Sequence, residues 1–156
     1  MNRYSFVTSG NDVIMTHKHM TPTLQFVSPG PVLDRLIDGV RRGVKTATSA
    51  LELSFTMRGE SLPRVGDRYT LIDSDNSPAA EIELTDVRVL RLDEVDLDVA
   101  TAEGDWFDSV EQWREAHERF FNRSAERVAT FLELDSWQAS DDTMVVVRFF
   151  RVVWCS

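Results

Sequence analysis

The sequence lacks the features that mark several common classes of protein. Its 156 residues include one cysteine, Cys155, which cannot form an intrachain disulfide and is typical of a protein from the reducing cytoplasm. The most apolar run, Met144–Val147, is four residues long, far short of the ~20 that span a bilayer. The first residues carry charges where a signal peptide would be apolar. We therefore expect a soluble, cytoplasmic protein that does not contact a membrane.

Positive charge is also scarce. Lysine and arginine number 17 against 26 acidic residues, a net charge of −9, whereas proteins that bind long duplexes mainly through charge are basic. We therefore expect no long duplex DNA as a partner. A local positive surface would need the C-terminal strand to lie beside the segment around Lys45; the alternative is a dispersed, solvated charge. The basic residues concerned are Arg41, Arg42, Lys45, Arg148 and Arg151.

Motifs for phosphate loops, metals and serine nucleophiles are absent. With seven glycines, the chain has no Walker loop, no Gly-x-Gly-x-x-Gly and no Gly-x-Ser-x-Gly. His17 and His19 have one further histidine in the chain to join them and no cysteine nearby, which is too few ligands for a zinc site. We predict neither a metal nor a cofactor.

The spacing of apolar residues predicts an α+β domain. A helix over 32–42 follows Pro31 and ends at Gly43, and a second helix begins at Ser109 and runs to about Leu132, with a break near Asn122. The acidic stretch from 93 to 98 is interpreted as a solvated loop or short helix. Alternating or β-branched apolar residues predict strands over 51–55, 68–73, 79–90 and 143–154.

The third of these strands changes phase near Thr85-Asp86, which predicts a bulge of the kind found where a sheet curls into a barrel. Residues 1–30 have little apolar surface and are predicted to be a loosely structured N-terminal extension. Residues 31–156 are predicted to form a single domain of four or five strands with two main flanking helices.

The segment Gly43-Val44-Lys45-Thr46-Ala47-Thr48 resembles the Gly-x-Lys-x-x-Thr signature of ASCH domains, a PUA-like family. Three later segments in the same order are also similar to that family: Leu62–Asp67 to its LPxVGD turn, Glu83–Val87 to its central strand, and Phe107–Phe121 to its WRxAHxxFF helix. The likeness extends from about Val32 to Trp154. It implies a small, curled, mostly antiparallel β-barrel with helices at its sides and a cleft beside Lys45.

Lys45 and Thr48 are three residues apart where the first helix gives way to a strand, so both side chains can reach one cleft. A desolvated lysine has a lowered pKa and can take the proton of a threonine hydroxyl, which then attacks a carbonyl carbon. A nearby carboxylate would orient the lysine or protonate the leaving group. The alternative is structural: Lys45 is a solvated charge at a helix end, and Thr48 is an ordinary strand residue.

The resemblance implies a catalytic set. Some small bacterial ASCH proteins are amidohydrolases that remove the acetyl group of acetylcytidine, and their lysine and threonine match Lys45 and Thr48. Their glutamate matches Glu103, with Asp105 as the alternative, whereas their arginine is replaced here by Ala50. This chain is longer than those small enzymes and more similar to another branch of the family, some of whose members bind or cleave RNA. The predicted function is hydrolysis of a modified pyrimidine nucleoside; the alternatives are a non-catalytic RNA-binding module and a ribonuclease.

The second helix carries Trp113, Arg114 and His117, which are helical neighbours at three- and four-residue spacing. In a binding site Trp113 would stack on a base, Arg114 would contact a phosphate or carbonyl oxygen, and His117 would transfer a proton. The structural alternative is that His117 bonds a backbone carbonyl while Trp113 packs against the sheet. These three residues, with Arg41 and Arg42, are the predicted binding residues for RNA or a small nucleoside.

Overall fold

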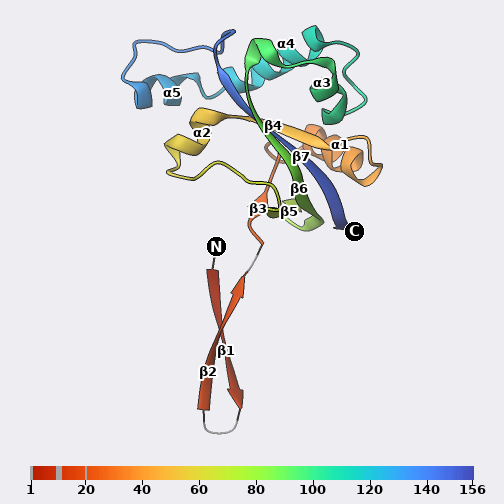
Figure 1. Ribbon diagram of the computed structural model, residues 1–156, viewed down its shortest axis with the longest axis vertical. Helices are drawn as coiled ribbons and strands as arrows, with labels where there is room; N and C mark the ends of the chain where they lie inside the picture. The colour runs from red at the N-terminus through yellow and green to blue at the C-terminus, as the bar shows by residue number, and fades with distance from the viewer. Residues whose placement is uncertain (1, 10–11, 20) are drawn as a thin grey trace.

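The computed structural model describes residues 2–9, 12–19 and 21–156, with side chains from residue 21 onward. Its main body is an open, mixed five-stranded sheet of order β3-β5-β6-β7-β4 with helices on both faces (Figure 1). All neighbouring strands are antiparallel except β3 and β5, which are parallel. The strands are β3 (Thr23–Leu24), β4 (Ala47–Leu51), β5 (Arg68–Ile72), β6 (Pro78–Arg91) and β7 (Met144–Cys155).

The α+β class is confirmed, but the described strands do not close into the predicted barrel. The edge strand β3 pairs with β5 over two residues only, and the chain leaves the other edge strand, β4, by turning into a helix. Five α-helices and one 3-10 helix are described, rather than two main helices. They are α1 (Pro31–Arg41), α2 (Glu52–Met57), η1 (Leu92–Glu94), α3 (Leu97–Glu103), α4 (Val110–Asn122) and α5 (Ala125–Leu132).

Helix α1 forms where the sequence predicts it. Pro31 occupies its first turn, and Leu33, Ile37 and Val40 recur at helical spacing and are all buried. These residues pack on the apolar side chains of β5, β6 and β7 that face the same side of the sheet. Gly43, with φ of 75°, follows the helix and redirects the chain toward β4.

The long β6–β7 pair forms the centre of the sheet. The β5–β6 hairpin closes through the Asp73–Ser77 turn. The register of β6 against β7 shifts between Leu84 and Asp86, which confirms the bulge expected near Thr85-Asp86. The predicted C-terminal core strand is confirmed as β7, of which residues 145–147 are fully buried.

The predicted strand over 51–55 is wrong, because β4 ends at Leu51 and residues from Glu52 onward form α2. Leu51 and Phe55 are both buried. Their four-residue spacing fits one face of a helix as well as one face of a strand, so three alternating residues could not decide between them. The break near Asn122 is confirmed, since α4 ends there and α5 begins at Ala125.

The N-terminal residues include an antiparallel pair, β1 (Asn2–Ser9) and β2 (Asp12–His19). Residues 23–27 contribute to the main body, because β3 pairs with β5 and the Phe26 ring stacks on Phe150 at 6.4 Å between centroids. The division of the chain at residue 30 stays a prediction. The side chains of His17 and His19 lie outside the described part of the chain.

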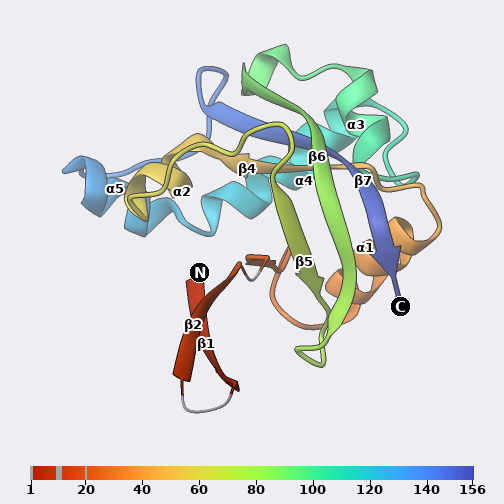
Figure 2. The ribbon, with the colours of Figure 1, turned by 60° about the horizontal axis from the view of Figure 1, so that its bottom comes forward.

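The sheet separates two layers, which meet at the free edge of β4 (Figure 2). On one face lie α1 and the segment around Phe26, and on the other face α3 and α4 enclose a second apolar cluster around Trp113 and Phe121. Of the helices in the described ranges, none has both the length and the apolarity to cross a bilayer. The arrangement leaves the β4 edge open between two layers of helices.

Candidate functional site

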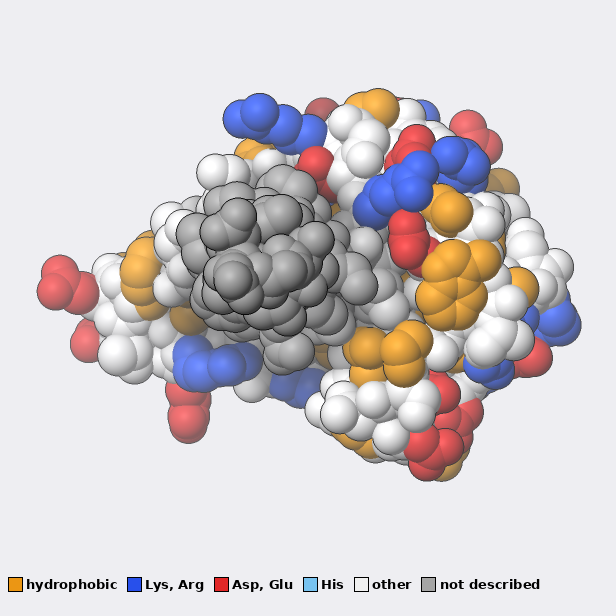
Figure 3. All heavy atoms as spheres, turned by 90° about the horizontal axis from the view of Figure 1, so that it is seen from below, with side chains coloured by type: hydrophobic (Ala, Val, Ile, Leu, Met, Phe, Trp, Pro, Cys, Tyr) orange, Lys and Arg blue, Asp and Glu red, His pale blue; other side chains and the backbone are white. Residues whose placement is uncertain are grey.

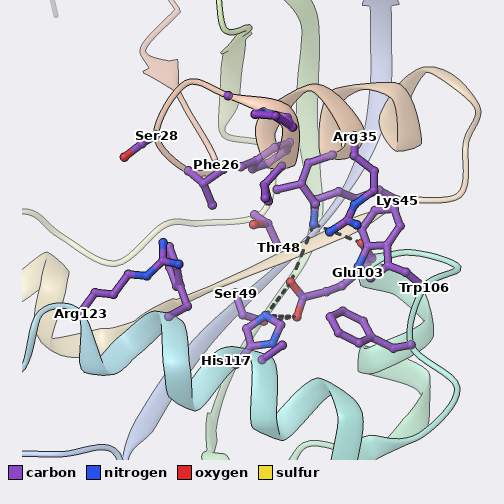
Figure 4. A pocket seen from close by; sticks show the side chains of 18 of the residues that line it. Phe26, Ser28, Arg35, Lys45, Thr48, Ser49, Glu103, Trp106, His117 and Arg123 are labelled. Atoms are coloured by element: carbon purple, nitrogen blue, oxygen red, sulfur yellow. Dashed lines mark hydrogen bonds and ion pairs between the residues drawn. The ribbon is translucent and has the colours of Figure 1, made fainter.

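A cleft of about 380 Å³ lies along this free edge (Figure 4). Its floor is β4 with Lys45 just before it, one wall comes from α1 and the Phe26 segment, and the other wall comes from α3, α4 and the loop between them. Aromatic side chains contribute to both walls, and a few polar groups converge between them. A cavity of this size and composition suits a small ligand such as a nucleoside.

Lys45 lies at the bottom of the cleft and is 3% exposed, so it is not a solvated helix-end charge. Its Nζ donates hydrogen bonds to the backbone oxygens of Ala47 (2.7 Å) and Glu103 (3.3 Å), and lies 4.9 Å from the centre of the Phe26 ring. Burial lowers the pKa of the Lys45 ammonium, and the Glu103 carboxylate, 3.8 Å from Nζ, offsets part of that effect.

Glu103 ends α3 and is 4% exposed. Ser49 Oγ donates to its Oε2 at 2.8 Å, Trp113 Nε1 donates to the same oxygen, and His117 Nε2 lies 3.2 Å from it. Burial raises the pKa of this carboxyl, but His117, Lys45 and the Trp113 hydrogen bond outweigh burial and hold the pKa at about 2. The cleft therefore contains a carboxylate that is ionised near neutral pH.

His117 links the carboxylate to α4. Its Nδ1 lies 2.8 Å from the backbone oxygen of Trp113, and its Nε2 faces Glu103. Both partners accept hydrogen bonds, so each ring nitrogen of His117 faces an acceptor. Trp113 is fully buried and stacks on the His117 ring at 3.9 Å between centroids, as the structural alternative predicts. Trp113 thus supports the site from behind, whereas His117 lines the cleft.

Thr48 projects into the cleft from β4, close to Lys45 (Figure 4). It is 8% exposed, and within residues 21–156 no side-chain hydrogen bond is found for its hydroxyl. Lys45, Thr48 and Glu103, predicted from the sequence, are thus brought together, although no hydrogen bond joins the Lys45 amine to the Thr48 hydroxyl.

Like Trp113, the three arginines that the sequence predicted to bind lie outside the cleft lining. Arg41 and Arg42 are at the exposed end of α1, and Arg114 lies on a side of α4 that does not line the cleft. Each is already engaged: Arg41 with Ser156, Arg42 with Asp38 and Asp105, and Arg114 with Glu118 and Asp141. Asp105, the alternative to Glu103, is therefore an exposed partner of Arg42.

Several cleft residues were missed by the sequence analysis. Phe26 fell in the segment interpreted as an extension, and Ser49 alternates away from Thr48 on its strand. Trp106 lies against Gly39 and Gly104, where an added Cβ would meet its ring. Gly104, two residues before Trp106, was the available signal in the sequence. Arg35 and Arg123, which also line the cleft, had no signal of their own.

No group of three or more His, Cys, Asp or Glu side chains that could hold a metal occurs in the part of the chain with described side chains.

The family model of the ASCH domain matches residues 23–154. The ASCH domain of Lactobacillus crispatus JV V101 is a structural neighbour with 29% sequence identity and a TM-score of 0.73, covering 85% of this chain and 79% of that chain. A protein of Enterococcus faecalis V583, described under the family model DUF984, has 32% identity and a TM-score of 0.65, with coverages of 76% and 67%. No protein with a curated description matches. The chain belongs to the ASCH domain family.

Proposed function

We propose that the cleft binds a modified pyrimidine nucleoside and hydrolyses an acyl group from its exocyclic amine. Lys45 is the general base and Thr48 the nucleophile. One observation carries the proposal: a buried lysine and a threonine hydroxyl that has no hydrogen-bond partner among the described residues share one small, aromatic-lined cleft with an ionised carboxylate. Lysine, threonine and carboxylate in such an arrangement are suited to acyl transfer.

The hydrogen bonds of Lys45 support its role as a base. Its two acceptors, the backbone oxygens of Ala47 and Glu103, account for the two N–H groups of a neutral amine and leave the lone pair free. Burial favours that neutral form, because it lowers the pKa of the lysine.

In the proposed reaction Lys45 takes the hydroxyl proton of Thr48 while Oγ forms a bond to the acyl carbon. The carbon–nitrogen bond then breaks as Lys45 returns that proton to the departing exocyclic nitrogen, leaving acyl-Thr48 and a free amine. A water molecule, deprotonated by Lys45, attacks the ester; the carboxylic acid leaves and Thr48 regains its proton.

The backbone of β4 offers a donor to the negative oxygen of the tetrahedral intermediate. Among the described strands, β4 pairs only with β7. The hydrogen bond that Phe150 N–H donates to the Thr46 oxygen fixes which backbone groups of β4 point toward β7. Thr48 therefore faces β7 with its backbone groups, whereas those of Ala47 and Ser49 point out to the cleft. The Lys45 bond to the Ala47 oxygen agrees with this pattern. The Ser49 N–H, next to the nucleophile, is suited to an oxyanion.

Glu103 is a positioning residue in this scheme. Its side chain fixes Ser49 and His117, and its backbone oxygen holds the Lys45 amine. The rival functions make different use of the same cleft. In a non-catalytic RNA-binding module Thr48 would bond a base edge without turnover, and in a ribonuclease Lys45 would stabilise phosphate charge.

The test is incubation with N4-acetylcytidine, with cytidine and acetate followed by chromatography. We expect equal amounts of the two products and a mass increase on Thr48 when the acyl-enzyme is trapped by acid quenching. Thr130→Val, on an exposed position of α5, is the control for Thr48→Val. Binding of cytidine without acetate release would establish the binding module instead, and cleavage of short RNAs would establish the ribonuclease.

A further inference from the structure

Most arginines of the described surface form ion pairs with carboxylates, and on the face shown in Figure 3 basic and acidic side chains are interspersed. The ion-paired arginines are Arg42, Arg58, Arg68, Arg88, Arg91, Arg114, Arg119 and Arg151. Two arginines that line the cleft, Arg35 and Arg123, form no ion pair with any described residue.

Both cleft arginines are held against aromatic rings that line the cleft. The Arg35 guanidinium, from α1, lies 5.5 Å from the centre of the Trp106 ring, and that of Arg123, after α4, lies 5.9 Å from the centre of Phe120. Such contacts orient a guanidinium while leaving its N–H groups free to donate. Figure 4 shows the two arginines on different sides of the cleft, with Thr48 and Phe26 between them.

The cleft is consequently positive in a protein of net charge −9. Its lining includes the guanidinium groups of Arg35 and Arg123, but Glu103 is its one carboxylate among the described residues. A neutral nucleoside would use the aromatic walls and the β4 edge without engaging either guanidinium. Phosphate is the anion that accompanies a nucleoside, and arginine is well matched to its geometry.

We infer that the ligand of this cleft carries phosphate on both sides of its sugar, with Arg35 binding one phosphate and Arg123 the other. The inference rests on the proposed nucleoside site and specifies its ligand class: a nucleoside bisphosphate or an internal residue of a single strand, rather than a free nucleoside. The two sources share the same chemistry, a base between aromatic walls and two flanking anions.

Four ligands that differ only in phosphate test this inference: cytidine, its 5′-monophosphate, its 3′-monophosphate and its 3′,5′-bisphosphate. In calorimetric titrations at low salt we expect the bisphosphate to bind at least tenfold more tightly than cytidine, with each monophosphate between them. Arg35→Gln and Arg123→Gln should each reduce the ratio of bisphosphate to cytidine affinity about threefold to tenfold. Each should abolish the advantage of a different monophosphate.

Arg64→Gln is the matched control, because Arg64 is exposed, outside the cleft and without an ion pair to any described residue. Equal affinity of wild type for cytidine and its bisphosphate, or an equal loss of the ratio in Arg64→Gln, would overturn the inference while leaving the nucleoside site intact. Failure of all four ligands to bind would overturn the proposed function as well. A trinucleotide that binds more tightly than the bisphosphate identifies a strand as the source, and equal affinity identifies the mononucleotide.

Discussion

The α3–α4 wall of the cleft and its β4 floor differ in how completely their polar groups are engaged. On the α3–α4 wall, the Glu103 carboxylate is contacted by Ser49, Trp113, His117 and Lys45. On the floor, the Thr48 hydroxyl has no side-chain hydrogen bond within the described residues. A buried polar group is ordinarily satisfied, so one without a partner that faces a cavity indicates a ligand position. The wall is preorganised, and the floor is open to substrate.

The largest expected effect comes from removing the nucleophile and the base at the floor of the cleft. Thr48→Val removes the nucleophile and Lys45→Met removes the base, so each should lower kcat for N4-acetylcytidine hydrolysis by a factor on the order of 10² or more. Because both residues serve one step, the double variant should be hardly slower than either single variant. Initial rates of acetate release provide the measurement. Additive losses in the double variant would contradict a base–nucleophile pair.

The next largest effect concerns the backbone N–H of Ser49 in β4, the floor of the cleft. Ser49→Pro removes the outward N–H at an edge position where proline is compatible with a strand, and should lower kcat about 10²-fold. Ser49→Ala is the matched control, because it keeps the N–H while removing the hydroxyl bonded to Glu103. Circular dichroism checks that both variants fold. Equal rates in the two variants would exclude the Ser49 amide as the oxyanion donor.

The stability of Glu103→Gln tests the preorganised α3–α4 wall. The pKa of Glu103 is lowered to about 2, so its ionised form stabilises the native state by about 3 kcal/mol at pH 7 relative to an ordinary carboxyl. That contribution is complete above pH ~4.5 and is lost as the pH falls toward 2. Urea unfolding should therefore give a deficit for Glu103→Gln that is constant near neutrality and shrinks in acid.

Glu111→Gln is the control for that deficit, because Glu111 lies in the exposed first turn of α4. Its unfolding free energy should match wild type within about 0.5 kcal/mol at every pH. A Glu103→Gln deficit that grows as the pH falls would have the wrong sign for a carboxyl with a lowered pKa, and would contradict the arrangement around Glu103.

The sequence predicted local features better than the way the sheet is enclosed. The α1 periodicity, the bulge near Asp86 and the final core strand all depend on neighbouring residues, and all three are confirmed. The closed barrel is not seen in the described strands, because closure depends on whether β3 and β4 meet, and neither edge carries a local signal of that. The wrong strand over 51–55 had too few alternating residues to exclude a helical turn.

For the site, the short spacing between a helix end and a strand predicted that Lys45 and Thr48 reach one cleft, and the family resemblance pointed to Glu103. Partners that come from distant segments were missed: Phe26 reaches the cleft through β3, and Arg123 through the end of α4. Arg41 and Arg42 were predicted on charge alone. The structure shows that a nearby hydroxyl already binds Arg41 and that a nearby carboxylate already binds Arg42.

The smallest expected effect concerns the salt dependence of ligand binding at the cleft arginines. With Arg41, Arg42 and Arg151 already engaged, Arg35 and Arg123 are the cleft arginines left to bind phosphate. Two contacts to a single-stranded ligand predict a slope of log K against log salt of roughly −1.4, since each phosphate contributes about −0.7. Titration of a trinucleotide at four salt concentrations measures it. Arg123→Gln should halve the slope, because one phosphate then loses its partner, whereas Arg64→Gln should leave it unchanged. A wild-type slope steeper than about −3 would mean that phosphates contact surfaces beyond the cleft, so the two walls alone would not define the binding site.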